Sequence, residues 1–307
     1  MKKEEFYRLS SDGVTQLHGF TWSPEGEVRA VLQLVHGMVE YIDRYDAFAA
    51  YLADRGIACI GHDHLGHGKS VTDETKLGHF ADNDGDKYVI EDMHRITEDA
   101  KERFPGKKVF VLGHSMGSFL LRKYITLYSG EIDGAIVMGT GYIPAVLAGT
   151  GKTLSGLTKA LKGAYHRSKL LTGLALGSNN KPFEPARTPN DWLSRNEENV
   201  DRYNADPLCG YMFTAASYVS FFTVIESLAR KEGFDRIRKD LPVLITSGEN
   251  DPVGGKAACP QVLQEFEALG MTDVTMKLYP EDRHEILNEV DRDEVYENIE
   301  KWLESKL

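Results

Sequence analysis

The sequence predicts an α/β protein whose mostly parallel central sheet is flanked by helices and interrupted by an inserted helical cap. Short β-branched apolar runs alternate with amphipathic segments up to about Tyr142, the alternation then stops, and it resumes near residue 231. Parallel strands are joined by crossover helices and buried on both faces, so their sequences are nearly continuously apolar. We therefore expect an α/β core made of residues 1–141 and 231–307, with residues 142–230 folded as the cap.

The elements before the cap follow from apolar periodicity. Two short strands flank Asp12-Gly13, a dipeptide that favours a hairpin turn because both residues tolerate positive φ. Apolar runs predict strands at 28–36, 57–63, 107–114 and 133–140. Helical spacing predicts helices at 44–56, 86–104 and 116–130. The last of these has an expected apolar face made of Leu120, Tyr124, Leu127 and Tyr128.

From Tyr142 to about Arg230 the chain is helix-prone or irregular, with a loop-like stretch at 177–190. Strand signals then return. Apolar runs predict strands at 241–248 and 273–279, and helical spacing predicts helices at 259–270 and 293–307. These four elements complete the expected core.

The composition is that of an ordinary globular protein, with 307 residues, 41% apolar and 27% charged. A formal charge of −11 argues against a nucleic-acid partner, which would need a basic face. The start MKKEEFYRLS lacks the apolar core of a secretory signal, so we expect a cytoplasmic location. Cys59, Cys209 and Cys259 have no CxxC spacing, which predicts neither a disulfide framework nor a thiolate zinc site.

The pentapeptide GHSMG, residues 113 to 117, matches the G-x-S-x-G pattern. Ser115 follows a predicted strand and opens a predicted helix, which is the setting that holds a nucleophilic serine in a strained turn with its Oγ exposed. Gly113 and Gly117 are expected there because larger side chains would clash across so tight a turn. The sequence therefore predicts Ser115 as a nucleophile.

A serine nucleophile needs a base, and the base needs an orienting acid. Asp251 and His284 each follow a later predicted strand, in the chain order serine, acid, histidine. Glu249 is the alternative acid, with a longer side chain nearer the strand. The oxyanion formed in the reaction would be held by the backbone N–H of Met116 and by that of Met38, in the HGM loop after the strand at 28–36.

The stretch GHDHLGHGKS, residues 61 to 70, brings His62, His64 and His67 close together and invites comparison with a zinc site. Gly66 stands where such a site would need an aspartate ligand. A metal would also leave the serine, histidine and aspartate unexplained. The sequence therefore favours a turn, and we expect no metal and no cofactor.

Taken with HGMVEYIDRY, SGENDPV and RHEILNE, these motifs make the sequence resemble the monoacylglycerol lipase and lysophospholipase group of α/β-hydrolases, which includes serine aminopeptidase-like members. The resemblance implies the roles given above for Ser115, Asp251, His284, Met38 and Met116. It also implies that D-x-x-G-H-G-x-S is a structural signature, matched here by Asp63, Gly66, His67, Gly68 and Ser70.

In the cap, the resemblance implies apolar helices that gate an acyl tunnel. Candidate lining residues are Leu154, Leu157, Leu161, Leu170, Leu171, Leu174 and Leu176. Residues 152–187 carry seven Lys and Arg against one acid, Glu184, which suits an anionic membrane surface or a phosphate-bearing lipid; an ordinary solvated helix face is the alternative. The segment DPLCGYMFT resembles a pocket-lining segment. We assign to the substrate pocket His36, Gly37, His114, Leu208 and Cys209.

We therefore expect a serine hydrolase that cleaves carboxylic esters of single-acyl lipids, either a monoacylglycerol or a lysophospholipid. An aminopeptidase-like enzyme with the same triad is the alternative; it would bind a free amine through Glu197, Glu198 or Asp201. A catalytically silent binding protein on the same scaffold is a third possibility, which the complete triad disfavours. The sequence leaves the oligomeric state open.

Overall fold

An eight-stranded sheet forms the centre of the computed structural model, which describes residues 1–307. Its strand order is β1-β2-β4-β3-β5-β6-β7-β8. From β3 to β8 all pairings are parallel, and β2 pairs antiparallel with both β1 and β4, so the predicted mostly parallel sheet is confirmed. The strands are β1 (Lys2–Leu9), β2 (Gln16–Ser23), β3 (Ala30–Val35), β4 (Ile57–His62), β5 (Lys108–His114), β6 (Gly134–Met138), β7 (Val243–Gly248) and β8 (Val274–Tyr279).

The hairpin at the N-terminal edge turns where the sequence predicts it. The Asp12 carboxylate accepts hydrogen bonds from the backbone N–H groups of Val14 and Thr15, and Gly13 has a φ of 76°. A side chain that closes a turn on its own backbone explains the preference for aspartate at this position.

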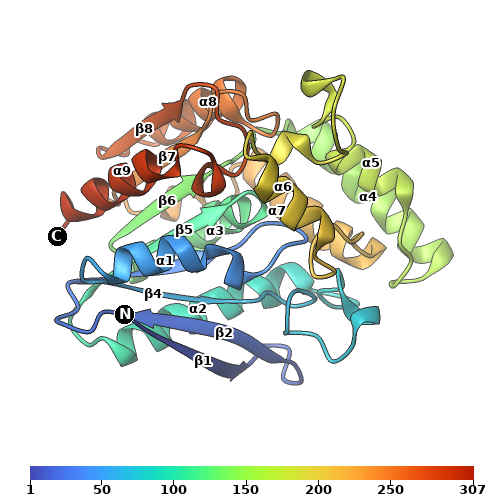
Figure 1. Ribbon diagram of the computed structural model, residues 1–307. Helices are drawn as coiled ribbons and strands as arrows, with labels where there is room; N and C mark the ends of the chain where they lie inside the picture. Colours follow the sequence, from blue (N-terminus) through green and yellow to red (C-terminus); the bar gives the residue numbers. More distant parts are fainter.

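Helices cover both faces of the sheet (Figure 1). Strand residues alternate between two apolar clusters: Phe110 and Leu112 of β5 pack with α1 and α9, whereas Val111 packs with α2, α3 and α8. This double burial is why the strand sequences are almost wholly apolar. The five helices are α1 (Asp46–Ala53), preceded by a 3₁₀ turn at Ile42–Tyr45, α2 (Gly85–Arg103), α3 (Met116–Tyr128), α8 (Gly255–Ala268) and α9 (Arg292–Glu304).

The expected apolar face of α3 is only partly buried. Leu120 and Tyr124 are buried, whereas Leu127 is 47% exposed and lines a surface groove.

The segment between β6 and β7 is helical, as expected for an inserted cap. It contains α4 (Ala145–Lys162), α5 (Lys169–Leu176), α6 (Glu197–Ala205) and α7 (Ala215–Ala229). Helix α7 packs against α4 and also against α2 and α3 of the core, so the boundary at residue 230 stays a prediction. Helices α4 and α5 lie at the far side of the molecule from both chain ends (Figure 1).

Candidate active site

The three predicted triad residues lie at one edge of the sheet. Ser115 directly follows β5, Asp251 lies in the loop after β7, and His284 lies in the loop after β8. Because these strands are parallel, their carboxyl ends meet at the same edge, where open α/β sheets place their sites. The topology thus brings together residues that are far apart in the sequence.

The turn at Ser115 is strained and closely packed. Ser115 has φ 53° and ψ −119°, and its N–H donates to the Met138 carbonyl of β6 at 3.0 Å. A Cβ at Gly113 would lie 2.3 Å from the Gly117 carbonyl oxygen, and a Cβ at Gly117 would lie 2.2 Å from the Val35 carbonyl oxygen. Only glycine fits at both positions, which is the reason that the motif carries them.

Asp251 contacts the His284 ring at Nδ1. His284 Nδ1 lies 2.9 Å from Asp251 Oδ1, which also accepts from the Val253 N–H, and Asp251 Oδ2 accepts from Ser247 Oγ. Burial opposes the negative charge, but the pairing with His284 and the hydrogen bonds from Ser247 and Val253 outweigh it and lower the pKa of Asp251. The aspartate, rather than Glu249, therefore contacts the histidine and leaves Nε2 free for a serine.

Ser115 and His284 line one small cavity of about 30 Å³, together with Met38 of the HGM loop. No hydrogen bond joins Ser115 Oγ to His284 Nε2 in this state, and such contacts commonly tighten only when substrate binds. Gly37 lies so close to the serine that a Cβ there would be 3.2 Å from Ser115 Cβ. Met116 is the first residue of α3, so its N–H has no acceptor in a preceding helical turn.

The loop that carries Met38 is held in an unusual conformation. Val39 has a φ of 52°, which is rare for a β-branched residue. The Val39 N–H donates to His67 Nε2 at 3.3 Å, and the Gly37 N–H donates to Glu40 Oε1 at 2.6 Å. The surrounding groups thus fix a backbone that would be costly by itself.

The histidine-rich stretch is a turn that supports this loop. Asp63 accepts hydrogen bonds from the backbone N–H groups of Ile42 and Lys69, and its Oδ2 lies 2.7 Å from His18 Nδ1. A Cβ at Gly68 would be 2.2 Å from Asp63 Oδ2, so glycine is required where the turn closes on the carboxylate. In this structure no group of three or more His, Cys, Asp or Glu side chains is placed to hold a metal ion.

Two carboxylates in the cavity wall, Glu40 and Glu285, are both paired with the same guanidinium. Arg44 lies 2.6 Å from Glu40 and 2.7 Å from Glu285, and Asn199 also donates to Glu285 at 2.7 Å. The sequence analysis missed this network. The i, i+4 spacing of Glu40 and Arg44 was an available signal, but Glu285 gave none.

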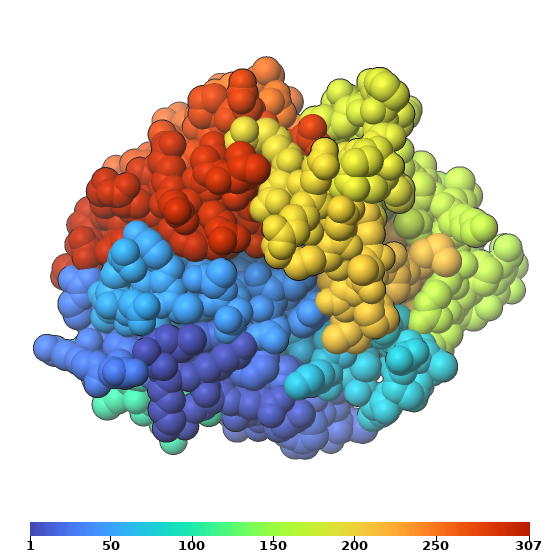
Figure 2. Space-filling model, in the orientation of Figure 1, coloured from blue at the N-terminus to red at the C-terminus, as the bar shows by residue number.

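The cap supplies the roof of the cavity through Leu176, Trp192, Leu193 and Tyr203. The Trp192 ring lies 4.9 Å from the His284 ring, with an interplanar angle of 39°. Figure 2 shows the α6 segment, in yellow, packed against the red C-terminal part of the chain and against the blue N-terminal part. No motif marked these roof residues, because the cap sequence has no pattern that fixes its path over the sheet.

The predicted pocket residues divide into two groups. Gly37 and His114 line the cavity, whereas His36 is fully buried beneath it and Leu208 is half-buried outside its wall. Cys209 is buried behind the cavity wall, where it packs in a cluster with Trp192 and Tyr203. Of the seven candidate tunnel leucines only Leu176 reaches the cavity. Four are exposed: Leu157, Leu161, Leu170 and Leu174.

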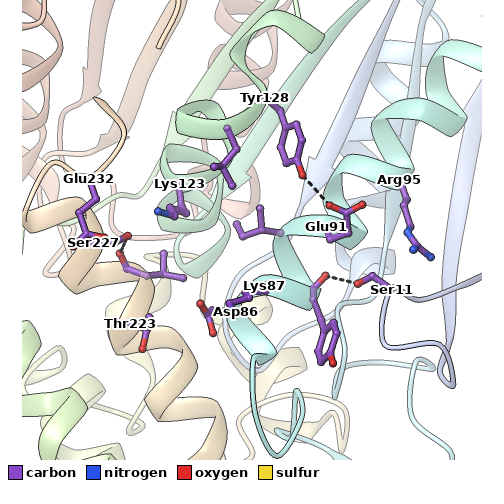
Figure 3. A pocket seen from close by; sticks show the side chains of 14 residues that line it. Ser11, Asp86, Lys87, Glu91, Arg95, Lys123, Tyr128, Thr223, Ser227 and Glu232 are labelled. Carbon is purple, nitrogen blue, oxygen red and sulfur yellow. Dashed lines mark hydrogen bonds between the residues drawn. The ribbon is translucent and has the colours of Figure 1, made fainter. Parts of the chain in front are cut away.

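A wider groove of about 590 Å³ lies between α2, α3 and α7 and shares no residue with the site cavity (Figure 3). Tyr128 donates to Glu91 on one side of it, and Ser11 donates to the Tyr88 carbonyl on another. The side chains that line this groove include both acidic and basic residues. This groove is separate from the residues at the carboxyl edge of the sheet.

A serine on a strained strand–turn–helix, with an aspartate and a histidine after two later strands of a mostly parallel sheet, defines the class of α/β-hydrolases. Residues 26–291 match the model of the serine aminopeptidase S33 family, and the chain belongs to this family of hydrolases.

Similar proteins agree with this assignment. The chain is 27% identical to a monoacylglycerol lipase of Mycolicibacterium smegmatis, over 93% of this chain and 92% of that protein. It is 25% identical to the human monoglyceride lipase, over 93% and 86% of the two chains. A thermostable carboxyl esterase from Bacillus coagulans, solved with glycerol, superimposes with a TM-score of 0.91 at 26% identity and covers 99% of both chains. None of the helices is both long and apolar enough to cross a bilayer.

The buried histidines predict a specific dependence of stability on pH. Burial lowers the pKa of His62 and His67 to about 3 and also lowers those of His36 and His64. In the unfolded chain these groups protonate near pH 6.5, so below that pH the unfolded state binds more protons and stability falls. His114 acts in the opposite sense, because its pKa is raised against burial by Glu40. Asp282 also acts in the opposite sense, because burial raises its pKa to about 7 and the folded state gains a proton there. We expect the free energy of unfolding in urea to fall by about 2 kcal/mol from pH 7.5 to pH 5.5.

The variant His64→Phe is the matched control for this measurement. Neither ring nitrogen of His64 has a hydrogen-bond partner, so the substitution removes one titrating group without breaking a ring hydrogen bond. Its loss between the two pH values is expected to be smaller by about 1.4 kcal/mol. Equal stability of the unmodified protein at both pH values would contradict the neutral, buried state of these rings.

Proposed function

We propose that this protein hydrolyses carboxylic esters of single-acyl lipids through an acyl-enzyme, with a monoacylglycerol as the favoured substrate. The observation that carries the proposal is the placement of Ser115 on a strained turn beside the buried His284–Asp251 pair, in one cavity. The relatives named as monoacylglycerol and monoglyceride lipases support the lipid class.

In the proposed reaction Ser115 Oγ attacks the ester carbonyl while His284 Nε2 takes its proton. The oxyanion of the tetrahedral intermediate accepts hydrogen bonds from the Met38 and Met116 N–H groups. His284, whose positive charge is balanced by Asp251, then protonates the departing alcohol. A water molecule repeats the sequence on the acyl-enzyme, which releases the fatty acid and restores the serine.

The charges in the cavity wall favour a neutral head group over a phosphate. No Lys or Arg side chain lines the cavity, and its two carboxylates are both paired, Glu285 with Arg44 and Glu40 with Arg44 and His114. A lysophospholipid phosphate would therefore find no free cation there, whereas the hydroxyl groups of glycerol need none. The seven basic residues between 152 and 187 lie in the cap segment, outside the cavity lining.

The same wall disfavours the aminopeptidase alternative. Glu197, Glu198 and Asp201 have side chains that are 77%, 78% and 58% exposed, so they lie on the outer surface of α6. Binding of a free amine needs an unpaired carboxylate near the serine, and Glu40 and Glu285 are both occupied.

The cavity has to open before an acyl chain can enter, since about 30 Å³ is the space of a single water molecule. The α6 side of the cap is fastened to the loop that carries His284. The Glu285 N–H donates to the Leu193 carbonyl at 2.7 Å, and the Arg195 N–H donates to Glu289 at 3.0 Å. We therefore place the opening on the side of α5, where Leu176 closes the roof.

The outer face of α4 and α5 suits contact with a lipid surface. Val146, Leu147, Leu157 and Leu161 are 55 to 82% exposed, and at helical periodicity they fall within an arc of about 100°. Leu170 and Leu174, one turn apart on α5, are also exposed, and nearby lysines add positive charge. Apolar side chains rimmed by lysines are typical of helices that lie in the interface of an anionic membrane.

Replacement of the nucleophile tests the reaction itself. We expect Ser115→Ala to lower kcat for a monoacylglycerol by at least about 10⁴-fold, because the residual rate comes from binding and the oxyanion donors alone. The variant should also lose labelling by a fluorophosphonate while its circular dichroism stays that of the unmodified protein. Full esterase activity in this variant would end the proposal.

A substrate panel tests the head group. The expected order of kcat/KM is monoacylglycerol above a lysophospholipid of the same acyl chain, and both above an aminoacyl anilide. Uncharged glycerol suits a wall without free charges, whereas the other two substrates bury an unpaired phosphate or amine. Preference for the anilide would instead support the aminopeptidase reading, and preference for the lysophospholipid would refute the head-group argument.

Vesicle binding tests the cap surface. The double variant Leu157→Ser/Leu161→Ser should lose at least about tenfold in co-sedimentation with anionic vesicles, because it removes two exposed apolar side chains. Hydrolysis of a short soluble ester should not change, since neither residue lines the cavity. Unaltered vesicle binding would show that this face does not contact lipid.

A further inference from the structure

His114, the residue before the nucleophile, is buried between two parts of the active site that come from different loops. Its Nδ1 lies 3.2 Å from Glu40 Oε1 and 3.1 Å from the Tyr45 hydroxyl, and its Nε2 lies 3.2 Å from the carbonyl oxygen of His284. The ring of His114 is 4.7 Å from the ring of His284. His114 thus contacts both Glu40, which supports the loop of Met38, and the loop that carries His284.

Both ring nitrogens of His114 face groups that accept hydrogen bonds. The carbonyl oxygen of His284 can only accept, so Nε2 has to carry a proton. On the other side the Tyr45 hydroxyl donates its proton to Glu40 at 2.9 Å, so a lone pair of the hydroxyl oxygen faces Nδ1. The Glu40 carboxylate, which can only accept, lies next to it. Nδ1 therefore carries a proton too. A histidine that donates from both nitrogens is an imidazolium.

The charge on this ring is balanced inside the protein. Glu40 and Glu285 provide two negative charges, and Arg44 together with a protonated His114 provides two positive ones. Burial works against the charge, but the hydrogen bond and negative charge of Glu40 prevail and raise the pKa of His114. The neighbouring His36 is buried with a lowered pKa and stays neutral.

We propose that His114 is a protonated positioning residue, which ties the Glu40 support of the oxyanion loop to the His284 backbone. This inference rests on the proposed serine hydrolase function.

The first consequence is geometric. Glu40 Oε1 accepts the Gly37 N–H, so the ring that holds Glu40 also fixes the backbone next to Met38. The second consequence concerns the loop after β8. His114 Nε2 donates to the His284 carbonyl oxygen, and Asp251 lies against Nδ1 of the same residue, so both the backbone and the ring of His284 are held.

The protonation state can be measured without turnover. In protein labelled with ¹⁵N-histidine, one ring is expected to keep two N–H signals above about pH 6.5, where an ordinary histidine has lost one of its protons. Both signals should be missing in His114→Gln. In Glu40→Gln, which removes the carboxylate, one of them should disappear as the ring becomes neutral. A His114 ring with a single N–H at about pH 7 would overturn the proposal.

The positioning role is measured by kcat and KM on a soluble ester. The variant His114→Gln loses the ring that links Glu40 to the His284 backbone, so kcat should fall by at least about tenfold while KM changes little. The control His94→Gln, in a partly buried histidine that stacks on Tyr128, should leave kcat unchanged. An unchanged kcat in His114→Gln would overturn the positioning role. Failure of the Ser115→Ala test would remove the catalytic role, whereas the ¹⁵N signals would still decide the protonation state.

Discussion

The close approach of α3 to the end of β3 is the constraint on which the site depends. Because Gly117 has no side chain, the backbone of the helix reaches the Val35 carbonyl, and a methyl group there would lie only 2.2 Å from it. This contact fixes the distance between Ser115, the proposed nucleophile before α3, and the HGM loop that continues from β3. The proposed oxyanion donors, the N–H groups of Met38 and Met116, come from these two segments, so backbone packing sets their spacing.

Around this contact the protein places histidines among three different sets of neighbours. The rings under the HGM loop are buried and neutral, and His67 serves as an acceptor that holds Val39 at a positive φ. His284 pairs with a carboxylate. His114 faces acceptors on both sides. The neighbours, rather than the residue type, decide what each imidazole does.

Much of the core could be predicted because its signals are local. The sheet, the hairpin at Asp12-Gly13 and the order serine, aspartate, histidine follow from apolar runs and loop positions, and the structure places Ser115, Asp251 and His284 at one edge. The residues that cover the cavity could not be predicted. Trp192 and Tyr203 belong to the cap, and no pattern in the sequence fixes the position of the cap helices relative to the sheet. The leucine-rich stretch misled for a related reason: an outward apolar stripe and an inward one have the same periodicity, and Leu161 is exposed.

The positions of the chain ends bear on how the protein can be used. Both lie at the amino edge of the sheet: the terminal amine pairs with Glu25, and the terminal segment contacts Lys108 at the start of β5. Helices α4 and α5 occupy the opposite side (Figure 1). A tag, solid support or fusion partner attached at either terminus therefore lies away from the α5 side, where we place the opening of the cavity.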